Sequence, residues 1–330
     1  MNSPQKIDEE ILRLLELRAR LVTRQTDLPP RKMLLDAEKK ETILREVASL
    51  CQQLVQPVQV AFLGPLYSYT HLAMEQFFGS GVAHSPVTTI ESVFEEVLRE
   101  QAHYGVVPIE NSTDGRVVDA LEMFTRVPVR ICGEVEIPIH HTLMARCPRE
   151  EIREVHSKPQ ALSQCRHWLV RHLPNVRLVE VTSTAAAAQN AQTQGGVAAV
   201  ASPLAARAYE LTPLVESIAD NTNNVTRFVV LGKEDAPRTK HDKTSLMFAL
   251  PHESGSLADA LTIFKRHKIN LTWIESFPIP TSPGTYLFFV DFYGHRTELK
   301  VRRALEMLEK KTQRLEILGS YPMAGKAPGK

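Results

Sequence analysis

One stretch of the chain decides how the fold is interpreted: Asp220-Asn221-Thr222-Asn223-Asn224-Val225-Thr226-Arg227-Phe228-Val229-Val230-Leu231. Amide, hydroxyl and charged side chains crowd its first half, and its second half is an apolar run that predicts a buried strand. The junction therefore places hydroxyl, amide and guanidinium groups at the end of a sheet, where open α/β folds bind ligands. An Asx-rich turn that only leads into a strand would give the same pattern.

The size and composition of the chain exclude several classes of protein. Its 330 residues suffice for two or three domains. The net charge of +1 does not support a nucleic-acid or membrane surface. No apolar run approaches the ~18 residues of a membrane span, and the charged N-terminus lacks the core of a signal peptide. The four cysteines have no paired spacing, so we expect reduced thiols and a cytoplasmic protein.

The N-terminal segment predicts a helical hairpin over residues 1–56. Residues 3–56 contain no glycine, and their apolar side chains follow helical spacing on both sides of Asp27-Leu28-Pro29-Pro30. Ser3-Pro4 predicts the start of the first helix, and the second is expected from about Lys32 to Leu54. Such a hairpin cannot bury both apolar faces alone, so we expect it to pack on the next domain or on a second copy.

The first of these helices, Ile7–Leu21, resembles the first helix of the all-helical chorismate mutases. In that family the Arg at the position of Arg18 binds a substrate carboxylate. The rest of the pattern is incomplete, because Pro29-Pro30 stands where a lysine is expected and no third helix fits before Pro57. A dianionic substrate needs several converging cations. We therefore interpret the segment as a truncated, dimerising remnant, with retained mutase activity as the alternative.

After residue 57 the pattern alternates between strands and helices. The predicted strands are 58–63, 104–108, 129–139, 154–156, 177–181 and 197–201. The predicted helices are 71–78, 90–101, 116–125, 159–172, 185–192 and one that begins at Pro203. This alternation indicates parallel or mixed sheets with helices on their faces.

Three of the predicted helices begin after hydroxyl or amide side chains. These groups are Ser68 with Thr70, then Asn111-Ser112-Thr113, then Thr182-Ser183-Thr184. Each group alone is a good helix cap. Three of them after strands, together with Asn223–Arg227, favour more than capping, because helix N–H groups and hydroxyls bind anions. Their convergence would suit a small molecule with two carboxylates.

Residues 58–235 resemble a prephenate dehydratase domain through five motifs in the same order. The motifs are Phe62-Leu63-Gly64-Pro65, Val107-Pro108-Ile109-Glu110-Asn111-Ser112, Pro159-Gln160-Ala161-Leu162, Thr182-Ser183-Thr184-Ala185-Ala186 and Asn224-Val225-Thr226-Arg227-Phe228. The resemblance implies a two-lobed α/β fold like that of periplasmic binding proteins over residues 57–235, with an inserted lobe at about 140–200. The chain departs from the family at Tyr67, where glycine is usual, and at Lys158, where histidine is usual.

The resemblance implies a carbon–oxygen lyase of L-phenylalanine biosynthesis that converts prephenate to phenylpyruvate, water and carbon dioxide without a metal or organic cofactor. Thr226 would be catalytic and donate a hydrogen bond to the departing hydroxyl, where transition-state charge builds. The implied substrate-binding residues are Ser68, Asn111, Ser112, Thr182, Ser183, Thr184, Asn224 and Arg227. The pair His140-His141 is not expected to bind metal, because adjacent strand residues point to opposite faces.

The last part of the chain predicts the order βαββαβ, which is typical of a ferredoxin-like arrangement. The strands are expected at 244–251, 269–278, 284–293 and 315–321, and the helices at 255–267 and 299–312. Residues 243–325 resemble an ACT domain, a regulatory module for small molecules. By that resemblance Gly255, Leu257, Glu275 and Ser276 would contact L-phenylalanine or another amino-acid effector, although Phe277 stands where the family has arginine.

Several functions stay open at this point. The first is a prephenate dehydratase that forms a homodimer or homotetramer and is regulated through its ACT domain. The alternatives are a bifunctional chorismate mutase/prephenate dehydratase, an arogenate dehydratase, and a non-catalytic ligand sensor. Retention of Thr226 and Arg227 argues against the sensor. No motif decides between prephenate and arogenate, and we expect no nucleic-acid or membrane partner.

Overall fold

The computed structural model describes residues 3–25, 35–278 and 286–324, without the side chains of residues 19–25 and 38. The chain divides into two compact units. The first holds residues 1–58 with 78–83, and the second holds residues 59–77 with 84–330. Among the described residues, no helix combines the length and the apolar character that crossing a bilayer requires.

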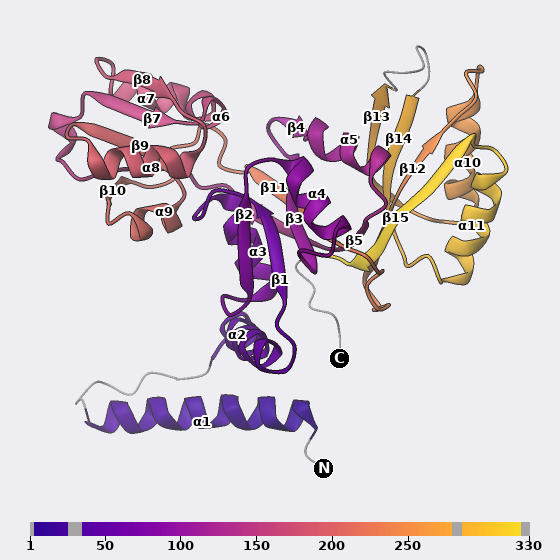
Figure 1. Ribbon diagram of the computed structural model, residues 1–330, viewed down its shortest axis with the longest axis horizontal. Helices are drawn as coiled ribbons and strands as arrows, with labels where there is room; N and C mark the ends of the chain where they lie inside the picture. Colours follow the sequence, from indigo (N-terminus) through magenta and orange to yellow (C-terminus); the bar gives the residue numbers. More distant parts are fainter. Residues whose placement is uncertain (1–2, 26–34, 279–285, 325–330) are drawn as a thin grey trace. The chain divides into compact units, whose positions relative to one another are not determined.

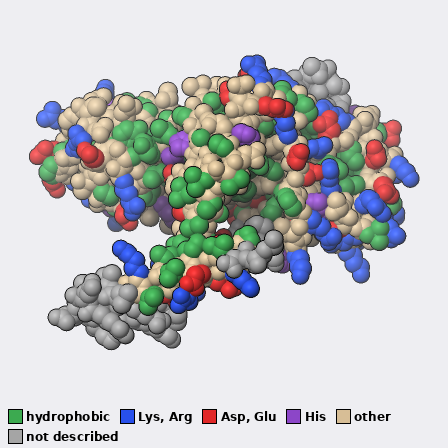
Figure 2. All heavy atoms as spheres, turned by 60° about the horizontal axis from the view of Figure 1, so that its bottom comes forward, with side chains coloured by type: hydrophobic (Ala, Val, Ile, Leu, Met, Phe, Trp, Pro, Cys, Tyr) green, Lys and Arg blue, Asp and Glu red, His purple; other side chains and the backbone are tan. Residues whose placement is uncertain are grey.

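The first unit contains the two expected helices, α1 (Pro4–Gln25) and α2 (Ala37–Val55) (Figure 1). The start of α1 at Pro4 agrees with the prediction. The second helix begins later than predicted, because Asp36 caps it by accepting a hydrogen bond from the Lys39 backbone at 2.9 Å; residues 32–34 lie outside the description. Apolar side chains along both helices stay exposed in the single chain, among them Leu14 and Leu54. Figure 2 shows hydrophobic side chains at the surface of the molecule.

The first lobe of the second unit is built on a mixed sheet in the order β2-β1-β3-β11-β5, with β4 beside β3. Its strands are β1 (Gln59–Leu63), β2 (Ala83–Val87), β3 (Tyr104–Asn111), β4 (Gly115–Arg116), β5 (Arg130–Pro138) and β11 (Val225–Gly232). Strand β11 is the predicted buried strand, and it runs antiparallel between β3 and β5. It is therefore an interior strand of the sheet, with a hydrogen-bonded neighbour on each side.

The helices of the first lobe are α3 (Tyr69–Phe78), α4 (Ile90–Leu98) and α5 (Val118–Arg126). Thr89 caps α4 by accepting a hydrogen bond from the Ser92 backbone at 3.1 Å. The apolar face of α4 packs against α5, where the rings of Phe94 and Phe124 meet edge to face.

The second lobe is an insertion between β5 and β11. Its sheet has the order β10-β6-β9-β7-β8. The elements are β6 (Thr142–Ala145), η1 (Arg149–Glu151), β7 (Glu154–Ser157), α6 (Pro159–Gln164), α7 (Arg166–His172), β8 (Arg177–Glu180), α8 (Thr184–Thr193), β9 (Val197–Ala201), α9 (Pro203–Ala208) and β10 (Thr212–Val215). Because β10 belongs to this sheet, the lobe extends beyond the expected range of about 140–200. The chain thus crosses between the lobes twice, as the two-lobed prediction required.

The C-terminal part forms a separate antiparallel sheet in the order β13-β14-β12-β15. Its elements are β12 (Asp242–Ala249), α10 (Ser256–Arg266), β13 (Leu271–Pro278), β14 (Tyr286–Tyr293), α11 (Leu299–Glu309) and β15 (Arg314–Pro322). This is the expected ferredoxin-like βαββαβ arrangement, and α10 and α11 cover one face of the sheet (Figure 1).

The other face of this sheet joins the first lobe in one hydrophobic core. Phe289 and Tyr321 belong to the same buried cluster as Phe124 and Ile131. The approach is closest at Gly319, where an added Cβ would lie 2.0 Å from the carbonyl oxygen of Ile131. A side chain there would collide with backbone, so glycine is required for β15 to lie against β5.

Four strands and one helix break were not anticipated from the sequence. Strands β2, β4, β6 and β10 are absent from the predicted set. Of these, β2 is an exposed edge strand that contains Pro86, and sheets tolerate proline in an edge strand. The predicted helix at 159–172 is two helices that meet at Cys165. The described cysteines are all free thiols, as expected.

Candidate functional site

A cavity of about 630 Å³ collects most of the polar residues that the sequence singled out. Its lining includes residues of β3, β4, β11 and the start of α3 in the first lobe, and residues of α6 and the start of α8 in the second lobe. The volume lies within the range of about 300–1,000 Å³ that small-molecule sites usually have. The cavity is therefore the candidate functional site.

Thr226 and Asn111 form the centre of the first-lobe wall. The two residues are direct cross-strand partners on β11 and β3. The Asn111 amide nitrogen donates one hydrogen bond to Thr226 Oγ1 at 2.7 Å and another to Asn224 Oδ1 at 2.9 Å. Among the described residues, the Thr226 hydroxyl donates to no protein group. Its proton is therefore available to a ligand in the cavity.

The turn after β3 fixes the orientation of Asn111. Its Oδ1 accepts hydrogen bonds from the Thr113 and Asp114 backbones at 2.9 and 3.0 Å. Gly115 then takes a φ of +83°, which favours glycine, and leads into the short strand β4. The prediction that Asn111-Ser112-Thr113 precede a helix is wrong, because this Asx turn leads to β4 and α5 begins only at Val118.

The second lobe contributes hydroxyl groups at the start of α8. Ser183 caps this helix by accepting a hydrogen bond from the Ala186 backbone at 3.0 Å, and Thr182 and Thr184 line the cavity beside it. Ser68 does the same for α3, accepting from the His71 backbone at 3.3 Å. Both caps were predicted. Their hydroxyl oxygens accept from the backbone, which leaves their protons able to donate into the cavity.

A hydrogen-bonded chain centred on Gln164 connects the two lobes at the cavity. Gln164 donates to Asp114 at 2.9 Å, and its carbonyl oxygen accepts from Asn224 at 2.9 Å. The same oxygen lies 2.9 Å from His141 Nε2, so this ring nitrogen must be the donor. Burial lowers the pKa of His141, with a smaller opposing effect from Gln164. His141 is therefore a neutral hydrogen-bonding group.

Two cations line the cavity, Arg116 on β4 and Lys158 just before α6. Lys158 was noted as a departure from the family pattern, but Arg116 was missed. Its only signal in the sequence is its place directly after the Asn111–Gly115 turn. Tyr69, His141 and Gln164 also line the cavity and were not predicted as site residues.

Six of the nine predicted catalytic and substrate-binding residues line the cavity, and the other three have different surroundings. Those that line it are Ser68, Asn111, Thr182, Ser183, Thr184 and Thr226. Ser112 instead accepts from the Val225 backbone at 2.9 Å. Asn224 is only 2% exposed and forms hydrogen bonds with Asn111 and Gln164. Ser112 and Asn224 therefore support the cavity wall from behind and do not line it.

Arg227 requires a correction, because its side chain lies on the other side of β11 from the cavity. It forms an ion pair with Asp291 of β14, and its Nη1 lies 3.5 Å from Glu134 of β5. Lys243 of β12 bonds Glu134 at 2.8 Å, and the Arg227 guanidinium lies 4.9 Å from the centre of the Trp273 ring. We call these five residues the buried charge cluster. Arg227 therefore joins the first lobe to the C-terminal sheet and does not reach a ligand in the cavity.

The predicted effector residues lie on the C-terminal sheet and at the start of α10. Gly255 has a φ of +89° and precedes α10, in which Leu257 is partly buried. On β13 the side chains alternate, so Glu275 and Ser276 point to opposite faces. Glu275 forms an ion pair with Arg116 at 2.8 Å. In the first unit, Arg18 is exposed on α1.

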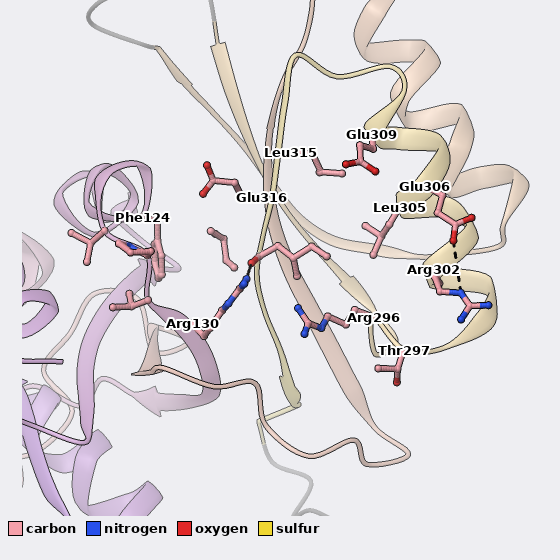
Figure 3. A pocket seen from close by; sticks show the side chains of 15 residues that line it. Phe124, Arg130, Arg296, Thr297, Arg302, Leu305, Glu306, Glu309, Leu315 and Glu316 are labelled. Atoms are coloured by element: carbon pink, nitrogen blue, oxygen red, sulfur yellow. Dashed lines mark hydrogen bonds and ion pairs between the residues drawn. The ribbon is translucent and has the colours of Figure 1, made fainter. Parts of the chain in front are cut away.

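A second cavity of about 640 Å³ lies between β5, α11 and β15 (Figure 3). Its size equals that of the candidate site, but its arginines already have partners. Arg130 donates to the Ile317 carbonyl, Arg302 pairs with Glu306, and Arg296 pairs with Asp235. Within the described part of the chain, no group of three or more His, Cys, Asp or Glu side chains could hold a metal ion.

Comparison with known proteins shows the family of the chain. The family model of prephenate dehydratase matches residues 60–236, which include the Asn111–Thr226 wall and the whole second lobe. The chain belongs to the prephenate dehydratase family. It is 42% identical to a bifunctional chorismate mutase/prephenate dehydratase of Aquifex aeolicus, over 97% of this chain and 96% of that protein.

Similar solved structures include a prephenate dehydratase and a protein described as having a different activity. A prephenate dehydratase from Arthrobacter aurescens, crystallised with L-Phe, is 33% identical with a TM-score of 0.74, covering 83% of this chain and 92% of that one. A protein described as a novel type of quorum quenching acylase is 28% identical with a TM-score of 0.73, covering 81% of this chain and 98% of that one. A shared fold therefore does not by itself specify the chemistry, which depends on the residues of the site.

Proposed function

We propose that this chain is a carbon–oxygen lyase that converts prephenate to phenylpyruvate, water and carbon dioxide in the cavity around Thr226. The observation that carries the proposal is the hydrogen bond from Asn111 to Thr226 Oγ1. Because that oxygen already accepts, the hydroxyl proton can point at a leaving group. As the ring carboxylate departs, charge develops on the expelled hydroxyl, and a fixed donor stabilises it more in the transition state than in the substrate.

The cavity also matches the two carboxylates of prephenate. Arg116 and Lys158 supply two positive charges, and the hydroxyls of Thr182, Ser183 and Thr184 supply neutral donors. Neutral His141 can hold a ring substituent without adding charge. A Thr hydroxyl is too weak an acid to give up its proton here, so we propose that Thr226 only donates a hydrogen bond and that the proton which converts the expelled hydroxide to water comes from solvent through a water molecule in the cavity.

The acylase described above is a weaker model for this chain. Its identity is 28%, against 42% for the bifunctional enzyme over nearly the whole chain. A dianion-binding cavity with a hydroxyl donor at its centre also suits dehydration better than cleavage of a neutral amide. The proposal therefore keeps the dehydratase activity, with an ACT-type C-terminal domain that binds an amino acid such as L-phenylalanine, a homodimeric or homotetrameric state, and a cytoplasmic location.

The N-terminal helices leave one alternative open, because the Aquifex relative is named as a bifunctional enzyme. Arg18 is exposed on α1, and an isolated exposed cation does not form a site for a dianion. We propose that the segment has no mutase activity of its own in a single chain. A second copy could supply further residues, which makes the alternative testable.

The test is to incubate the purified full-length protein separately with prephenate, arogenate and chorismate. We expect phenylpyruvate from prephenate, little phenylalanine from arogenate, and no consumption of chorismate. Turnover of chorismate would restore the bifunctional alternative, and preference for arogenate would change the substrate. Binding of prephenate without product would contradict the proposed enzyme and support the ligand sensor.

A further inference from the structure

Glu275 of the C-terminal sheet bonds a residue that lines the proposed substrate cavity. The sequence placed it among the effector contacts, but its carboxylate bonds Nη1 of Arg116 at 2.8 Å. The Arg116 and Glu275 side chains are 39% and 26% exposed, so the pair is reachable by water and by ligands. One partner lines the substrate cavity and the other belongs to a different domain.

The alternation of β13 explains how Glu275 reaches Arg116. Trp273, Glu275 and Phe277 share the less exposed face of this strand. Phe277 lies in the core that joins the sheet to the first lobe, and Trp273 stacks on Arg227 behind β11. These two neighbours fix the backbone on both sides of Glu275. Its carboxylate is therefore held in a defined place beside β4.

Arg116 can bind a second carboxylate while it holds Glu275. A guanidinium has five N–H donors in a rigid fork, and Glu275 accepts from Nη1 alone in the direct hydrogen bond. Its attraction for another anion is weaker in this state, because Glu275 neutralises part of its charge and also repels the incoming carboxylate.

We propose that Arg116 is a substrate-carboxylate ligand that Glu275 shares, so that the C-terminal sheet lowers the affinity of the cavity for its dianionic substrate. This inference rests on the proposed function, since it assumes that prephenate binds in the cavity. It makes Arg116 a residue that contacts substrate and Glu275 a positioning residue that acts through it. It also gives the C-terminal domain a direct route to the cavity that involves one ion pair.

The shared arginine also suggests how a ligand of the C-terminal domain would act. Ser276 lies next to Glu275 on the opposite, exposed face of β13. A ligand that binds there and shifts this strand changes the distance between Glu275 and Arg116. Drawing Glu275 away would strengthen substrate binding, and pressing it closer would weaken it.

A double-variant cycle on the full-length protein tests the proposal. Arg116→Gln is expected to raise KM for prephenate about tenfold or more, with kcat within about threefold, because one charged hydrogen bond to the substrate is lost. Glu275→Gln is expected to lower KM about two- to fivefold, the range for an exposed ion pair. When Arg116 is already replaced by Gln, the further change Glu275→Gln should leave KM for prephenate unaltered.

The matched control is Arg99→Gln with Glu95→Gln, an exposed ion pair of the first lobe outside the cavity, which should leave KM unchanged. The proposal is overturned if Glu275→Gln raises KM, or if it lowers KM equally with and without Arg116. It is also overturned if Arg116→Gln leaves KM unchanged while the unmodified protein converts prephenate. Absence of any turnover in the unmodified protein would instead contradict the proposed function.

Discussion

The two sides of strand β11 carry adjacent residues of one motif in opposite surroundings. Thr226 lines the cavity, is partly exposed and keeps a hydroxyl proton for a ligand. Arg227 lies behind the strand, 7% exposed, among carboxylates of β5 and β14 and against the ring of Trp273. The comparison teaches that adjacent residues of one motif can divide between a ligand-facing position and a structural one.

The two sides of β11 differ in how far their charged side chains are neutralised by protein groups. The cavity side stays open to water, and Glu275 neutralises only part of the charge of its two cations, Arg116 and Lys158. The buried charge cluster is already neutralised, because Arg227 and Lys243 face Glu134 and Asp291. A substitution on the cavity side should therefore reduce turnover, and one in the cluster should reduce stability. Variants on each side of β11, compared for stability and for turnover, test this difference.

Arg227→Gln should give the largest effect. It leaves Asp291 buried without its cation, which costs about 3–5 kcal/mol of the free energy of unfolding when one partner of a buried ion pair is removed. Urea unfolding monitored by tryptophan fluorescence measures this, and Trp273 is itself a reporter at the cluster.

Arg227→Lys is the control, because it keeps the charge and should recover part of the loss. The pairing of Arg227 with Asp291 predicts that Arg227→Leu with Asp291→Leu is less unstable than Arg227→Leu alone. If Arg227→Gln keeps normal stability but raises KM for prephenate tenfold or more, Arg227 binds substrate after all and its structural role is wrong.

Asn111→Asp should reduce kcat about 100-fold, the range for loss of one oriented transition-state donor. The new carboxylate cannot donate to Thr226 Oγ1 and would accept the hydroxyl proton instead, so the hydroxyl would turn away from the substrate. Steady-state kinetics with prephenate gives the value. Asn221→Asp changes an exposed amide outside the cavity lining and should leave kcat within about twofold. If Asn111→Asp and Asn221→Asp change kcat equally, Asn111 does not orient the Thr226 hydroxyl.

The pKa of His71 in the first lobe gives a prediction for how stability depends on pH. Burial lowers its pKa to about 4, with a smaller effect of His84, and its Nδ1 accepts from the Tyr67 backbone at 3.1 Å, which only the neutral ring can do. The unfolded chain, with an ordinary pKa near 6.5, binds the proton first as the pH falls. Stability is therefore lost below about pH 6.5, by about 1 kcal/mol between pH 7 and pH 5.5.

The measurement for His71 is urea unfolding at both pH values, compared with His71→Asn. The variant should lose about 1 kcal/mol less than the unmodified protein over this interval, since other titrating groups cancel in the difference. Identical losses would show that His71 titrates normally in the folded protein.

Part of this arrangement could be predicted from the sequence. The apolar run after Thr226 identified β11, and the hydroxyl groups before α3 and α8 identified two walls of the cavity. The alternation of a strand already implies that Thr226 and Arg227 point to opposite faces, so the error over Arg227 was avoidable. The order of elements in the C-terminal part was sufficient to predict its ferredoxin-like sheet.

Other features could not be predicted because they depend on distant partners. Arg116 and Glu275 are 159 positions apart, and no local pattern pairs them. Asn111 resembles a helix cap in sequence, yet its two amide protons are used by Asn224 and Thr226, which lie more than 100 positions away. Strand β2 was missed because an exposed edge strand with a proline has neither alternation nor an apolar run.

The most direct test of the central claim is the kcat of Thr226→Val and Thr226→Ser with prephenate. Valine keeps the shape and removes the hydroxyl, and serine keeps the hydroxyl. The account predicts that valine lowers kcat about 100- to 1,000-fold with little change in KM, that serine retains most of the activity, and that both variants unfold at nearly the same urea concentration as the unmodified protein. If valine turns over prephenate as fast as serine does, Thr226 is not the donor and the proposed mechanism is wrong.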